Sequence, residues 1–140
     1  MASSDLNQLF NEALSFAEYM LIAHGEFIPF GVSMDPTGKI AQVAGDLGTE
    51  HPQSADMVDL LQSVFRESAA TGSIYAAGVC IDMLVVPPGG AEKSDAICVR
   101  LAHTSGESVS VYVPYAKTQG ACTFGQAFAT QGDSFRLVEP

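Results

Sequence analysis

Apolar side chains recur every three or four residues along two stretches of the chain, and helix start and stop signals bound each stretch. Such spacing places the apolar side chains on one face of an α-helix. The first stretch, 5–24, has Ser4 placed to cap the helix and Gly25 placed to end it. The second begins near Pro52, which suits a first turn, and ends at Gly72. The apolar stripes are Leu6, Leu9, Phe10, Ala13, Leu14, Ala17, Met20 and Leu21 in the first helix, and Met57, Leu60, Leu61, Val64, Phe65 and Ala69 in the second.

Between the helices the apolar period changes to two, which is typical of a strand with one buried face. Two such stretches, 28–34 and 39–45, flank the turn sequence "DPTG". Asp suits the first position of this turn, Pro the second, and Gly the position where a positive φ closes a hairpin. We therefore expect a hairpin in which Met34 faces Ile40.

After the second helix the alternation returns in three longer stretches. These are 73–86, 96–103 and 108–115, and the flexible sequence "PPGGAEKSD" separates the first two. The sequence "TSG" before Glu107 fits a three-residue hairpin loop, which pairs Leu101 with Val109. Over 117–140 the pattern weakens, and we expect short strands or an irregular C-terminal cap.

These elements predict an α+β fold in a single domain, 1–140. The expected sheet is antiparallel, has about five strands, and carries two helices packed on it, in the chain order α-β-β-α-β-β-β. At 140 residues and 47% hydrophobic, the chain is large enough to bury a core of its own.

Charge and composition narrow the classes of partner. Sixteen acidic residues against six basic ones give a net charge of −10, which disfavours nucleic acid and anionic membrane surfaces as partners. The N-terminal segment lacks the basic region and apolar run of a signal peptide, so a cytoplasmic location is expected. Three irregularly spaced cysteines, Cys80, Cys98 and Cys122, favour reduced thiols over a disulfide framework.

The sequence contains no recognisable catalytic or metal-binding motif. The titratable residues around "HGEFIPFGVSMDPTGKI" have no metal-ligand spacing, and a helix-to-hairpin junction explains that composition. Those residues are His24, Glu26, Asp46, Glu50 and His51. A catalytic Cys122 would need His103 beside it, which only a particular fold of the C-terminal segment would provide. "PPGG" and "GDLG" lack the lysine of a phosphate loop, so we assign no catalytic residue, metal or cofactor.

One sheet face gathers polar residues in a pattern that follows from the turn assignments. If the loop 87–95 closes symmetrically, Asp82 lies opposite Arg100, and the "TSG" loop places Arg100 opposite Ser110. Tyr112 and Cys98 then become neighbours on the same face. This face is either a solvated surface with a weak ion pair or a site for a small ligand or a partner, with Asp82, Arg100, Ser110 and Tyr112 as the candidate residues.

The order of elements resembles the roadblock and profilin-like architecture, and roadblock-type domains usually dimerise and act as scaffolds or regulators of small GTPases. The residues "HGEFIPFGVSMDPTGKI", followed by "VYVPY" and "FGQAFA", also resemble a bacterial family of uncharacterised small proteins. That resemblance implies a prokaryotic cytosolic protein and transfers no activity to any residue here.

The function that these features favour is a non-enzymatic protein-interaction or scaffold module, a homodimer whose sheet or helix surface binds a protein partner, itself included, or a small ligand. An unpaired outer strand offers one route to dimerisation. A second hypothesis is a ligand sensor or small enzyme that uses the face of Asp82, Arg100 and Tyr112. A third is an acidic immunity-type inhibitor of a basic protein.

Overall fold

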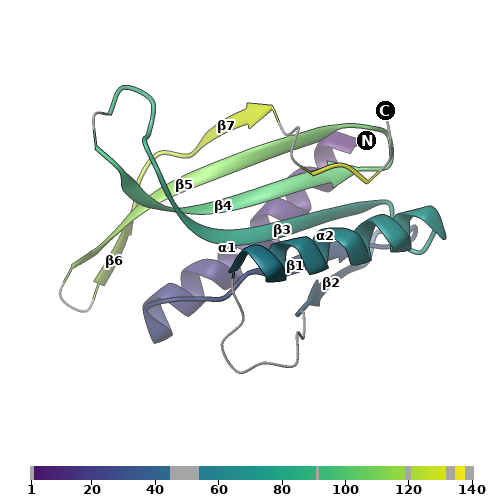
Figure 1. Ribbon diagram of the computed structural model, residues 1–140, viewed down its shortest axis with the longest axis horizontal. Coiled ribbons are helices and arrows are strands. Elements are labelled where there is room, and N and C mark those ends of the chain that lie inside the picture. The colour runs from purple at the N-terminus through teal and green to yellow at the C-terminus, as the bar shows by residue number, and fades with distance from the viewer. Residues whose placement is uncertain (1, 45–53, 91, 119–120, 132–134, 138–140) are drawn as a thin grey trace.

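Two helices lie on opposite faces of one antiparallel sheet in the computed structural model of the chain, with α2 on the near side in Figure 1 and α1 on the far side. The structure describes residues 2–44, 54–90, 92–118, 121–131 and 135–137. Within these ranges the elements are α1 (Ala2–His24), β1 (Phe30–Met34), β2 (Ile40–Val43), α2 (Ser54–Ala70), β3 (Ala76–Val85), β4 (Ser94–His103), β5 (Ser108–Thr118), β6 (Ala121–Phe124) and β7 (Phe128–Gln131). The predicted α+β class with two helices on an antiparallel sheet is confirmed.

Both helices end where their glycines predict, but the first helix does not begin where its capping residue predicts. α1 ends at His24, and Gly25 takes a φ of 80° while its N–H donates to the carbonyl of Leu21. Gly72 likewise has a φ of 80° just beyond α2. The prediction that Ser4 caps α1 is wrong, because neither Pro nor Gly precedes Ser4 and the helix already begins at Ala2. The expectation for Pro52 falls outside the described residues.

Both predicted hairpins have the register that their turn residues indicate. Met34 pairs with Ile40, and the Asp35 carboxylate accepts hydrogen bonds from the Thr37 hydroxyl, the Thr37 N–H and the Lys39 N–H. These bonds, the one from the Thr37 hydroxyl above all, lower the pKa of Asp35. In the second hairpin, Leu101 pairs with Val109 across the "TSG" turn.

The sheet has seven strands within the described residues rather than the expected five. Its order is β2-β1-β3-β4-β5-β6, and β7 also pairs with β5. β6 pairs with the end of β5, from Tyr115 to Thr118, whereas β7 pairs with its beginning, from Val109 to Tyr112. The segment after residue 117 therefore supplies two short strands along the outer edge of β5.

Each face of the sheet carries its own hydrophobic core, because successive residues of β3 and β4 point to opposite sides. Under α1, the side chains of Leu9, Ala13 and Ala17 contact a layer that includes Phe30, Val32, Met34, Ile97, Val99 and Leu101. Under α2, Met57, Leu61 and Phe65 contact Ala77, Val79 and Ile81, with Phe135 and Leu137 of the C-terminal segment beside them.

One close approach fixes how α2 sits on the sheet. A Cβ atom at Gly31 of β1 would lie 2.4 Å from Cζ of Phe65, which is 2% exposed. Only glycine leaves room for the Phe65 ring at this spacing.

No described helix combines the length and the apolar composition needed to cross a membrane.

Candidate functional site

The polar face predicted around Arg100 exists in part, and it lies on the α2 side of the sheet. Arg100 pairs with Ser110 and Cys98 pairs with Tyr112, as the "TSG" turn predicted. α2 adds a residue that the sequence did not indicate, because the Nη1 of Arg100 donates to Oε1 of Gln62 at 3.3 Å. Arg100 and Tyr112 are partly exposed, whereas Ser110 and Gln62 are buried.

The predicted pairing of Asp82 with Arg100 is wrong. Asp82 lies opposite Ile97, and Arg100 lies opposite Val79. The symmetric loop placed residue 86 opposite residue 96, whereas β3 stops pairing at Val85, which meets Ser94. Two prolines follow Val86 and cannot donate backbone hydrogen bonds, so pairing ends one residue before the predicted position on β3, while pairing on β4 begins two residues before it. The resulting shift of three positions is odd, and an odd shift moves a side chain to the other face of the sheet.

Asp82 therefore lies on the α1 face, where it accepts a 2.6 Å hydrogen bond from the hydroxyl of Tyr115. Burial raises the pKa of the Asp82 carboxyl, and the carboxylates of Asp95 and Glu26 raise it further, while the Tyr115 bond and Lys117 act in the opposite direction. Burial and the Asp82 carboxylate both raise the pKa of Tyr115. The hydrogen bond thus joins a buried tyrosine to a carboxylate that is partly exposed.

An aromatic pair and a cavity extend the Arg100 face toward the edge of the sheet. Tyr112 and its partner Phe128 on β7 stack with ring centroids 5.0 Å apart and an interplanar angle of 14°. Phe128 also lines a cavity of about 400 Å³ together with the prolines Pro87, Pro88 and Pro114. A second cavity, of about 280 Å³, lies where the end of α1 meets β5 and β6, and Ile22, Lys117 and Cys122 line part of it.

The three thiols are poorly placed for nucleophilic chemistry. Burial raises the pKa of Cys98 to about 11 and that of Cys80 well above its ordinary value. Burial also raises the pKa of the partly exposed Cys122. The hypothesis that His103 activates Cys122 is wrong, because His103 faces the start of β5, whereas Cys122 pairs with Lys117, about 33 Å farther along the strand.

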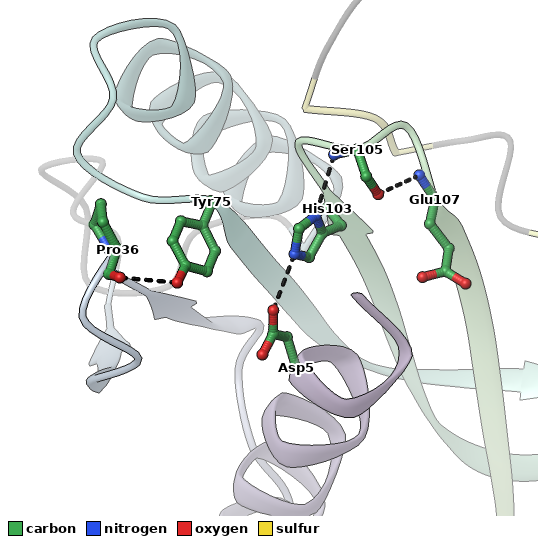
Figure 2. A network of polar contacts seen from close by, with 6 residues as sticks. All are labelled: Asp5, Pro36, Tyr75, His103, Ser105 and Glu107. Atoms are coloured by element: carbon green, nitrogen blue, oxygen red, sulfur yellow. Dashed lines mark hydrogen bonds and ion pairs between the residues drawn. The ribbon is translucent and has the colours of Figure 1, made fainter. Parts of the chain in front are cut away.

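His103 instead belongs to a network that resembles a catalytic triad in composition only (Figure 2). Its Nδ1 accepts a hydrogen bond from the backbone N–H of Ser105 at 3.1 Å, so Nε2 carries the ring proton and donates it to Asp5 of α1, also at 3.1 Å. The Ser105 hydroxyl accepts from the N–H of Glu107. Both ring nitrogens are thus occupied, and the network ties the beginning of α1 to the turn between β4 and β5.

No metal centre is found in the part of the chain that the structure covers. Among the described residues, no group of three or more His, Cys, Asp or Glu side chains could hold a metal ion. Of the residues around the helix-to-hairpin junction, His24 and Glu26 are exposed, and Asp46, Glu50 and His51 lie outside the described residues.

The outward side of α1 differs in character from the outward side of α2. We use "α1 outer face" for the exposed residues of that helix, which are Ser4, Asn7, Gln8, Asn11, Glu12, Ser15, Tyr19, Ile22, Ala23 and His24. Glu12 is the one carboxylate in this set, and Tyr19 and Ile22 are 61% and 65% exposed. The exposed residues of α2 include Asp56, Asp59, Arg66 and Glu67.

Comparison of the chain with protein-family models, with curated proteins and with solved structures finds no match. The resemblances to the roadblock and profilin-like architecture and to a bacterial family of small proteins therefore stay predictions.

Proposed function

We propose that the chain is a non-enzymatic interaction module that pairs with a second copy of itself through the α1 outer face. The main support for this proposal is the position of Tyr19 and Ile22, which are highly exposed and lie three residues apart on one side of the helix. Large contiguous exposed apolar patches mark interaction sites, and tyrosine is enriched in protein interfaces.

The distribution of charge favours a second copy as the occupant of this face. A chain with a net charge of −10 repels itself, so two copies associate best where few carboxylates meet. The α1 outer face has Glu12 alone, whereas the exposed side of α2 has Asp56, Asp59 and Glu67. Depletion of charged residues is also the compositional signature of an interface core.

In a twofold-symmetric dimer, both the exposed apolar residues and the neighbouring cavity would contact the second copy. If the axis passes between Tyr19 and Ile22, each copy brings its Tyr19 against the Ile22 of the other. The cavity of about 280 Å³ beside Ile22 would then receive part of the incoming tyrosine ring. An interface of standard size buries about 800 Å² on each partner, which is about a tenth of the 7820 Å² surface of this chain.

Sedimentation velocity over a range of protein concentrations tests the proposal. We expect wild-type protein to form a dimer of twice 14.7 kDa, and we expect Ile22→Glu to weaken the dimer by at least about tenfold, because a new carboxylate from each copy would then lie beside the axis. The matched control is Val64→Glu, which places the same charge on a 40% exposed valine of α2. A wild-type monomer at every concentration, or equal dissociation by both variants, would contradict the proposal.

A further inference from the structure

Arg100 has few polar partners among the described residues, although the chain is rich in carboxylates. Among the described residues, no carboxylate oxygen forms an ion pair closer than 4.0 Å with Arg100. Its guanidinium group has five N–H donors; one of them donates to Gln62, and the Cys98 thiol lies beside the group. Because Arg100 is only partly exposed, water hydrates this charge less well than it hydrates a surface arginine.

The surroundings of Arg100 change from polar to apolar in one direction along the sheet. Ser110 lies directly opposite Arg100, Tyr112 follows it on the same face with its ring stacked on Phe128, and Pro114 comes next at the mouth of the 400 Å³ cavity. Ser110 and Pro114 are four residues apart along β5, which corresponds to about 13 Å. An elongated molecule that lies along this strand would meet a cation at one end and an apolar cavity at the other.

We propose that this face of β4, β5 and β7 binds a small carboxylate with an apolar body, with the carboxylate at Arg100 and the body along Tyr112 and Phe128 toward the prolines. A guanidinium group matches a carboxylate geometrically, since two parallel N–H donors meet its two oxygen atoms. A single arginine also fits one negative charge better than a phosphate, which proteins usually bind with clusters of cations. The volume of the cavity lies within the range of small-molecule sites.

This site is separate from the proposed dimer surface, because Arg100 lies under α2 and the α1 outer face lies on the other side of the sheet. Ligand binding and dimerisation can therefore fail independently of each other.

Isothermal titration calorimetry with decanoate tests the proposal, with decanol as a probe that has the same apolar chain and no carboxylate. We expect decanoate to bind wild-type protein at least about tenfold more tightly than decanol does. Arg100→Gln should abolish this preference for the carboxylate. The matched control is Lys93→Gln, which removes one positive charge from the exposed loop near Pro88, and it should keep the preference.

Chemical-shift mapping on the wild-type protein keeps the proposal testable if Arg100→Gln does not fold. Decanoate should perturb the backbone amides of Ser110, Tyr112 and Phe128 more than those of the α1 outer face. Three results would overturn the proposal: no decanoate binding by wild-type protein at millimolar concentration, equal affinity for decanoate and decanol, or shift changes confined to other surfaces.

Discussion

The close approach of Phe65 to Gly31 predicts that Gly31→Ala destabilises the fold although it adds only one methyl group. The new Cβ would lie 2.4 Å from Cζ and 2.7 Å from Cε2 of the Phe65 ring, whereas carbon atoms in contact prefer about 3.5 to 4.0 Å. The ring is 2% exposed and packs against Phe135, with 6.4 Å between centroids, so it moves only if the α2-face core rearranges. Overpacking of this kind costs about 1 to 3 kcal/mol.

Urea unfolding monitored by circular dichroism measures this cost. We expect the free energy of unfolding of Gly31→Ala to fall by about 2 kcal/mol and its Tm to fall by roughly 5 to 10 °C. Gly125→Ala is the matched control, because the nearest neighbour of its added methyl group, Cβ of Pro114, would lie 3.6 Å away, and it should stay within about 0.5 kcal/mol of wild type.

The smaller side chain in Phe65→Leu should relieve the clash. In the double variant that combines Gly31→Ala with Phe65→Leu, we expect the two substitutions to have a favourable coupling energy of at least about 1 kcal/mol. A Gly31→Ala variant as stable as wild type would contradict this prediction, because it would mean that α2 does not lie this close to β1.

Two further predictions concern the titratable groups. Because the folded state raises the pKa of Asp82 above its ordinary value of 3.8, it binds the proton more tightly than the unfolded state does, and this group lowers stability as the pH rises through the folded pKa. Asp82→Asn keeps an oxygen to accept the Tyr115 hydrogen bond, so its stability relative to wild type should increase between about pH 4 and pH 7 in urea titrations; a difference that does not change with pH would contradict this. For the thiols, a thiol-specific reagent should modify partly exposed Cys122 in native protein and buried Cys80 and Cys98 only after unfolding; rapid modification of all three would show that the cores are not closed.

Short loops made the local registers predictable from the sequence. The "DPTG" and "TSG" turns fix the number of residues between the paired strands, so the pairs Met34–Ile40 and Leu101–Val109 followed from turn chemistry alone. The loop between β3 and β4 has no such constraint. Pairing ends at Val85 on β3 and begins at Ser94 on β4, and this odd shift from the symmetric loop places Asp82 and Arg100 on opposite faces of the sheet.

The last two strands and the contacts between helices and sheet could not be predicted from local sequence patterns. β6 and β7 are four residues long and mostly exposed, so no buried face imposes an apolar period on them, and backbone pairing with β5 defines them. Gln62 meets Arg100, and Asp5 meets His103, because each helix covers a particular face of the sheet. Sequence periodicity shows that a helix has an apolar side, but it does not show which face of the sheet that side covers.

The salt dependence of the molar mass in solution tests self-association through the α1 outer face. Light scattering coupled to size-exclusion chromatography would be run on wild-type protein at low and at high salt. Salt screens the repulsion between two copies that each carry a charge of −10, while the apolar contact of Tyr19 with Ile22 is not weakened by salt. We therefore expect a dimer that tightens as salt is added, whereas a dimer that dissociates with salt, or a monomer at both salt concentrations, would rule out this mode of self-association.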